Sequence, residues 1–158
     1  MSGSIQSTEF TKGLLAVLTE AFESVQGIFL DANTSLFETL AGISAAEASI
    51  PVGGKCATIA AQVAHVNFYL EVLEHYLQSG QNERLDWGEI WRTVGEVTPE
   101  EWAASQARLR QTYQRLRKYV EAFEGWETED SIASAIGLVA HTAYHLGEIR
   151  QATCTVKS

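Results

Sequence analysis

Apolar residues recur every three or four positions through most of this sequence, and that periodicity restricts what the chain can fold into. Between Ala57 and Gln78 they fall on one side of a helix turning about 100° per residue. These residues are Ile59, Val63, Val66, Leu70, Leu73 and Leu77. No useful length of sequence alternates apolar and polar residues as a half-buried strand does. The sequence therefore predicts an all-α protein.

Four segments are long enough to form major helices: residues 5–29, 57–78, 99–123 and 131–155. A shorter helical piece, "SLFETLAGI", lies between the first two. The connection "EGWETED" is short, so the third and fourth helices should be antiparallel neighbours. The longer connection before the third helix lets the second and third run in the same direction. We expect one four-helix-bundle domain over residues 1–158, in up-down-down-up order.

Local signals mark where helices begin and where the chain leaves them. Thr98, Pro99 and Glu101 in "TPEEW" combine a cap, a first-turn proline and an acidic residue three positions after the cap. Ser44 and Glu47 have the spacing of a capping box, but Pro51 and two glycines follow. We therefore expect a loop between the short helical piece and the second long helix.

The charge balance restricts the partners. Twenty acidic residues against 11 basic ones give a formal net charge of −9, which opposes contact with nucleic acid or an anionic membrane. No apolar run approaches the roughly 20 residues of a membrane span, and no basic segment followed by an apolar one begins the chain. Cys56 and Cys154 lack metal-site spacing, so we expect two free thiols. We expect a cytoplasmic protein.

Two of the four histidines are four residues apart on the last helix, in "HTAYHLGEIRQ". Residues at this spacing stand one turn apart on one helix face, which suits two imidazoles that bind one ion. The pair alone is weak evidence, but Ser134, Gly137 and Ala152 share the line through His141 and His145. These small residues leave space above the imidazoles for a ligand or substrate.

A third metal ligand must come from another helix. His65 lies within the buried arc of the second helix, whereas His75 lies about 15 Å further along the axis, at the border of the polar face that begins with Asn67 and Glu71. The alternative for His65 is a core histidine hydrogen-bonded to a tyrosine or a carbonyl. We expect His65, His141 and His145 to bind one divalent ion, with the three rings within about 8 Å of one another.

Absent motifs narrow the chemistry. The sequence contains no ExxH, HExxH or CxxCH, so di-iron, zincin and c-type haem sites are excluded. Glu148 follows His145 by three residues and is the candidate catalytic residue, as a base or as the group that orients a metal-bound water. The alternative for Glu148 is an exposed helix carboxylate. Trp87, Trp91 and Trp126 lie in connections, where they could wall a pocket or anchor loops.

This pattern resembles the DinB-like superfamily of bacterial four-helix proteins. The matching residues are His65 in "AQVAHVNFYLEVL" and His141 with His145 in "GLVAHTAYHLGEIRQA". Helix lengths, the "AGISAAEA" turn and the "PVGGK" loop extend the likeness over nearly the whole chain. The resemblance implies an up-down-down-up bundle, often dimeric, that holds zinc, nickel or a similar ion through three histidines. It also implies thiol-dependent transferase or isomerase activity, or metal-dependent hydrolysis.

Three functional hypotheses follow. The first is a metal-dependent hydrolase or thiol S-transferase acting on a small molecule, with zinc or nickel as the ion and a low-molecular-weight thiol as a second cofactor. The second is a non-catalytic bundle that binds a metal or a small ligand. The third is a structural bundle with histidines in its core. The last helix is apolar over more of its circumference than one contact needs, so we also expect a homodimer.

Overall fold

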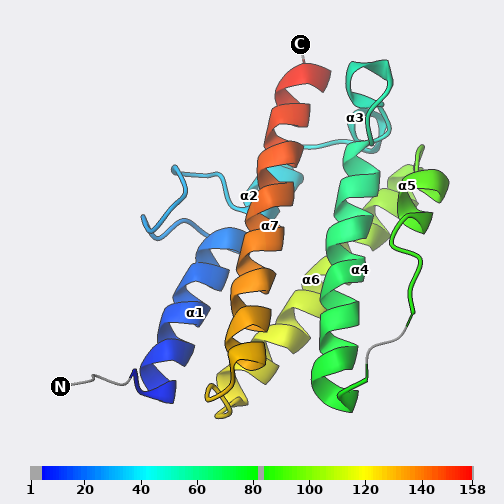
Figure 1. The fold of residues 1–158 in the computed structure, drawn as a ribbon. Coiled ribbons are helices and arrows are strands. Elements are labelled where there is room, and N and C mark those ends of the chain that lie inside the picture. The colour runs from blue at the N-terminus through cyan, green and yellow to red at the C-terminus, as the bar shows by residue number, and fades with distance from the viewer. Residues whose placement is uncertain (1–4, 82–83, 158) are drawn as a thin grey trace.

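The computed structural model describes residues 5–81 and 84–157, and all regular structure in these residues is helical. The prediction of an all-α fold is confirmed (Figure 1). The helices are α1 (Ser7–Phe22), α2 (Leu36–Ala41), α3 (Ala45–Ala48), the 3-10 turn η1 (Val52–Gly54), α4 (Ile59–Ser79), α5 (Glu89–Thr93), α6 (Pro99–Ala122) and α7 (Glu129–Val156). One domain over residues 1–158 stays a prediction; residues 1–4, 82–83 and 158 lie outside the described part.

Helices α4 and α1 each pack against both α6 and α7. The predicted antiparallel direction of α6 and α7 is found, but the two helices share few contacts, so the prediction that they are neighbours is wrong. In Figure 1, α1 and α7 run upward while α4 and α6 run downward. Two ion pairs between α4 and α6 agree with the parallel direction of these helices. Glu71 pairs with Arg108 at 2.7 Å and Glu74 with Arg115 at 2.8 Å, so residue numbers increase together along these two helices. The long connection between α4 and α6 therefore returns the chain to the end of the molecule at which α4 begins.

The core lies between these helices and is apolar. The large fully buried apolar side chains come from all four long helices and from α2: Leu18, Phe22, Leu36, Leu40, Ile59, Leu70, Leu109, Leu116, Leu146 and Ile149. Trp102 is also buried, and its Nε1 donates to the carbonyl of Ile43 at 2.8 Å. This bond ties α6 to the segment after α2 and satisfies the one polar atom of the indole.

Most helix boundaries agree with the sequence signals. The capping box at Thr98 and Glu101 is formed, with Pro99 at the first helical position. Ser44 and Glu47 form the predicted box too, and it begins the short helix α3 inside a segment that we expected to be a loop. Gly80 ends α4 in a left-handed conformation with φ of 68°, where a side chain would be strained. Local capping is thus readable from the sequence.

The prediction for the first helix is wrong at its C-terminal end, because α1 stops at Phe22 instead of continuing to Phe29. The cause is Glu20, whose side chain is fully buried. Its carboxylate accepts backbone N–H groups from Gln26 at 2.9 Å, Ile28 at 2.8 Å, Phe29 at 2.5 Å and Leu30 at 2.6 Å. Hydrogen bonds to a carboxylate are stronger than neutral ones, so the chain wraps around Glu20.

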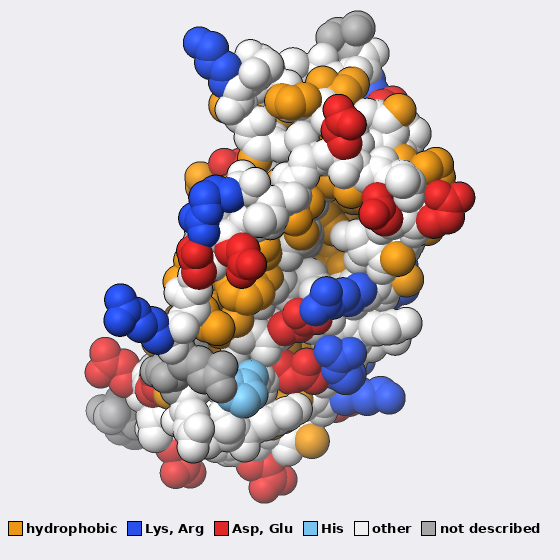
Figure 2. Space-filling view, turned by 90° about the vertical axis from the view of Figure 1, so that its right-hand side faces the viewer, with side chains coloured by type: hydrophobic (Ala, Val, Ile, Leu, Met, Phe, Trp, Pro, Cys, Tyr) orange, Lys and Arg blue, Asp and Glu red, His pale blue; other side chains and the backbone are white. Residues whose placement is uncertain are grey.

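The side of the molecule formed by α4, α5 and α6 carries mixed charge. Figure 2 shows acidic and basic side chains next to one another on this face, with hydrophobic side chains in a hollow between them. Asn67, which the pattern placed on a polar face, is instead buried, and its Oδ1 has no hydrogen-bond partner among the described residues. The expected solvent face of α4 is in fact partly covered by α6.

Three further findings concern the helices, the cysteines and His75. None of the described helices has the length and apolar character needed to cross a membrane. Cys56 and Cys154 are both exposed and free, as predicted. His75 is exposed on α4, as the sequence indicated.

Candidate metal centre

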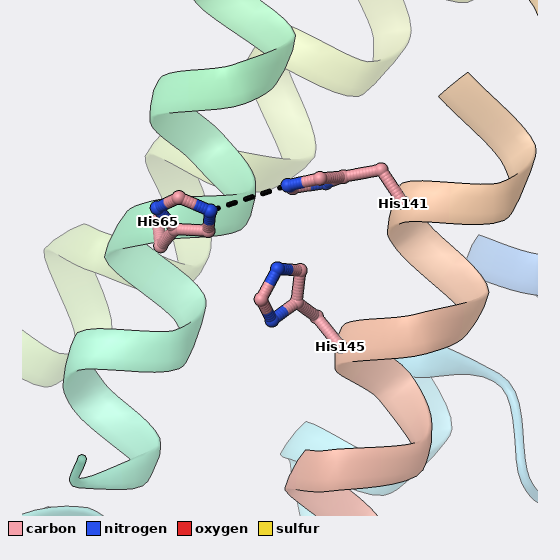
Figure 3. Close-up of side chains that lie close together, drawn as sticks. All are labelled: His65, His141 and His145. Carbon is pink, nitrogen blue, oxygen red and sulfur yellow. Dashed lines mark hydrogen bonds between the residues drawn. The ribbon is translucent and has the colours of Figure 1, made fainter. Parts of the chain in front are cut away.

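The rings of His65, His141 and His145 lie together between α4 and α7. The ring centroids are 5.1 Å apart for His65 and His141, 4.8 Å for His65 and His145, and 4.4 Å for His141 and His145. Figure 3 shows the imidazoles projecting from two facing helices toward a common space. The expectation that the three rings lie within about 8 Å of one another is confirmed.

The helix geometry explains this convergence. His141 and His145 are one turn apart on α7, so their side chains leave the same face. The helix α4 runs antiparallel to α7, and a hydrogen bond from Tyr76 Oη to Asp130 at 2.8 Å helps to set the register. In this register His65, which is buried, comes opposite the histidine pair.

The ring nitrogens are spaced for one ion. The Nε2 atoms of His65 and His141 are 3.2 Å apart. Two nitrogens that each lie about 2.1 Å from a tetrahedral ion are about 3.4 Å apart, so this edge of the site is close to preformed. One ligand atom from each of the three histidines lies within 4.8 Å of the other two. The three histidines therefore offer a three-nitrogen donor set for one ion.

His145 is oriented by two acceptors that hold its other ring nitrogen. Its Nδ1 lies 2.6 Å from Gln62 Oε1 and 3.0 Å from Glu148 Oε2. Because both partners accept, Nδ1 carries the proton and Nε2 is left with a free lone pair toward the site. The sequence pattern indicated Glu148 but not Gln62. Its position one turn before His65 on α4 is the signal that could have found it.

The other two histidines lack such partners. Nδ1 of His65 and Nδ1 of His141 are buried and make no hydrogen bond with any described residue. The 3.2 Å contact between their Nε2 atoms requires one nitrogen to donate a proton to the other in the metal-free protein. A cation that accepted both lone pairs would replace this single shared proton. The donor set therefore fits a divalent ion bound by neutral imidazoles.

Burial keeps the three imidazoles neutral. It lowers the pKa of His141 to about 3, with further lowering by the neighbouring His145 and His65. Burial and His145 lower the pKa of His65 from its ordinary 6.5, while Glu148 opposes the shift. Burial also lowers the pKa of His145, again against the opposing effect of Glu148. Neutral imidazole is the form that binds metal, so the site is ready to bind at neutral pH.

We expect the metal-free protein to lose stability as the pH falls from about 6.5 toward 3. In this range the unfolded chain protonates His141 and the folded chain does not, because the pKa is about 3 when folded against 6.5 ordinarily. Urea unfolding at about pH 7.5 and about pH 5 measures the change. The free energy of unfolding of His141→Ala should fall less between these two pH values than that of the wild type. An equal fall in the two proteins would show that His141 does not cause the pH dependence.

Aromatic side chains surround the histidines. The ring of Tyr69 stacks on His141, with centroids 3.8 Å apart and planes inclined by 10°. Trp91 lies 4.4 Å from His65 and Trp87 lies 6.5 Å from it, so both wall the site. Trp126 instead packs on Phe10 at 4.9 Å and anchors a loop. The two tryptophans of the connection between α4 and α6 therefore belong to the site, and Trp126 does not.

The small residues of α7 leave less free space above the imidazoles than the sequence predicted. A side chain built on Gly137 would come within 3.2 Å of Tyr69 Oη, so Tyr69 occupies the gap beside this glycine. Ser134, one turn earlier on α7, lines an open pocket with Tyr69. The space predicted above the imidazoles is thus filled by a tyrosine near the histidines and stays open one turn further along.

Comparison of the chain with protein-family models, curated proteins and solved structures finds no match. The geometry of the three histidines is therefore the main indication of function.

Proposed function

We propose that this protein is a metal-dependent enzyme of the DinB-like type, acting on a small molecule by hydrolysis or thiol-dependent transfer. The observation that carries the proposal is the convergence of His65, His141 and His145, which can hold one ion. We also propose that the long helices form a four-helix bundle in up-down-down-up order. The opposite directions of α4 and α7 and the parallel directions of α4 and α6 support this order.

In this proposal the three Nε2 atoms hold a divalent ion, zinc or nickel, and a low-molecular-weight thiol is the second cofactor. A bound ion of this kind lowers the pKa of water or a thiol toward neutrality and so supplies a nucleophile. Gln62 and Glu148 keep the proton of His145 on Nδ1. Tyr69 and Trp91 exclude bulk water from two sides of the imidazoles.

Glu148 is our candidate for the general base. Its side chain is 38% exposed, so a substrate can reach it, and Oε2 lies on His145 Nδ1. The carboxylate also accepts from Tyr144, which raises the pKa of that phenol. A proton that Glu148 took from a substrate or a nucleophile would thus lie next to His145, the metal ligand that Glu148 orients.

Two measurements test the proposed function. Elemental analysis of protein purified without a nickel column and then reconstituted should find close to one equivalent of zinc or nickel. A screen of thiol cofactors with small electrophiles and esters should then find turnover that requires the ion and that His141→Ala abolishes. Less than about a tenth of an equivalent of metal would overturn the metal site itself.

A second function, a non-catalytic bundle that binds a metal or a small ligand, is favoured by one observation. The carboxylate of Glu148 already accepts hydrogen bonds from His145 and Tyr144. These contacts are those of a group that orients a metal ligand, and they do not require a catalytic role. This function predicts full metal binding with no turnover in any arm of the screen.

We expect Glu148→Gln and Gln62→Ala each to weaken metal binding by about 10- to 100-fold without changing its stoichiometry, because both orient a ligand from outside the coordination shell. Competition with a chromophoric chelator measures the affinity. Glu129→Gln is the matched control because it removes an exposed carboxylate in the first turn of α7, about three turns before His141. An unchanged affinity in both variants would show that His145 needs no such support.

We further propose that the protein forms a homodimer through α1 and α7. Leu138, Leu146 and Ile149 of α7 are buried in the core of the chain, so they are not part of the surface that we propose for the dimer. A groove of about 540 Å³ between these helices is lined mostly by apolar side chains, among them Ile136, which is 60% exposed. Light scattering at micromolar concentration should give twice the chain mass, and Ile136→Glu should give the monomer mass. A monomeric wild-type protein would refute the proposal.

A further inference from the structure

A second pocket lies between α4 and α7, away from the three ring nitrogens. It has a volume of about 280 Å³ and is lined by Tyr69, Tyr76, Trp87, Asp130, Ser134 and two apolar residues of α4. Tyr69 is shared with the metal centre, because its ring stacks on His141. Asp130 is 11 residues before His141 on α7, or about 16 Å along the helix axis. The pocket is therefore adjacent to the metal centre and chemically distinct from it.

Three aromatic rings and one carboxylate set the chemistry of this pocket. The centroids of Tyr69 and Trp87 are 6.4 Å apart, and their planes are inclined by 51°. Because the two rings are tilted, a cation at the open side of the wedge that they form can lie within the roughly 6 Å at which a ring face attracts positive charge. Tyr76 adds a third ring and donates its hydroxyl proton to Asp130 Oδ2 at 2.8 Å.

The carboxylate supplies the charge that completes the pocket. Asp130 forms no ion pair with a described lysine or arginine, and its Oδ1 has no partner within residues 5–81 and 84–157. No cationic side chain among these residues therefore pairs with the carboxylate of Asp130. The net charge of −9 adds a long-range attraction for cations.

We propose that this pocket binds the ammonium group of a small organic cation. The ring faces of Tyr69, Tyr76 and Trp87 contact its methyl or methylene groups, and Asp130 balances its charge. Aromatic rings around an ammonium group are a recurring mode of recognition for quaternary and alkylated amines. A neutral aromatic ligand would contact the rings but would gain nothing from Asp130. The carboxylate therefore favours a cationic ligand over a neutral one. The proposal requires no ion at the three histidines.

Choline is the probe for the test, and 3,3-dimethylbutan-1-ol is its neutral isostere. Each is titrated into the full-length ¹⁵N-labelled protein, metal-free and metal-loaded, while the tryptophan indole N–H signals are followed. The Trp87→Leu variant assigns the signal of Trp87. We expect choline to shift this signal with a Kd below about 5 mM in both forms, and the alcohol to bind at least about fivefold more weakly.

Matched variants locate the charge. Asp130→Asn should weaken choline binding, followed on the Trp87 signal, at least about fivefold. Glu129→Gln, which removes the neighbouring carboxylate outside the pocket, should change the Kd less than about twofold. Circular dichroism confirms that each variant is folded. Equal binding of the two probes, no saturation of the Trp87 signal, or equal effects of the two carboxylate changes would overturn the proposal. Choline binding without any metal binding would sustain it while removing the proposed enzyme.

Discussion

Replacement of His65 by alanine is expected to reduce the zinc or nickel retained after reconstitution from about one equivalent per chain to less than about a tenth. His141→Ala should have the same effect. The 3.2 Å separation of the Nε2 atoms of His65 and His141 makes these two nitrogens the preformed edge of the site. Without either one, the two remaining imidazoles belong to a site too poor in ligands to retain an ion through gel filtration.

His75→Ala is the matched control, because His75 lies on the same helix as His65 and is exposed. It should leave the metal content unchanged. Thermal unfolding of the metal-free proteins separates binding from folding. If the histidines only filled the core, alanine at position 65 or 141 would lower the melting temperature and leave the metal content at the wild-type level. That result would support a purely structural bundle over a metal protein.

The second large effect is expected at Glu20, far from the histidines. Glu20→Gln should lower Tm by about 5–10 °C. The buried carboxylate accepts backbone N–H groups from Gln26, Ile28, Phe29 and Leu30. A neutral amide has one oxygen to accept with, and its own N–H₂ group would face the remaining donors, which would stay buried and unpaired. Glu9→Gln, on an exposed position of the same helix, should change Tm by less than about 2 °C.

The pH dependence gives an independent check on Glu20. Burial acts to raise the pKa of this carboxyl, but the four backbone N–H groups outweigh it and lower the pKa from 4.5 to about 2. Between these values the unfolded chain binds a proton that the folded chain does not. The stabilisation is therefore complete above about pH 4.5 and is lost as the pH falls toward 2. The difference in Tm between wild type and Glu20→Gln should shrink from about pH 6 to about pH 3; a constant difference would assign the loss to another cause.

Much of the candidate site could be predicted from the sequence, because it depends on local helical geometry. His141 and His145 share a face of α7 by their spacing alone, and the buried arc of α4 selects His65 over His75. The partners of these residues could not be predicted in this way. Gln62, Tyr69 and Trp91 reach the histidines from α4 and from the connection before α6, and their contacts depend on how two helices and a loop are placed.

The amino-acid sequence by itself determined the helical class, the capping boxes at Ser44 and Thr98, and the three histidines that could meet, because each depends on residues within a few turns of one helix. Only the tertiary structure decided where α1 ends and how far apart the ring nitrogens lie. Glu20 overrides a helical pattern by binding backbone groups up to ten residues away. The 3.2 Å contact between His65 and His141 joins residues 76 positions apart. Such contacts depend on the packing of the whole chain, which no local periodicity specifies.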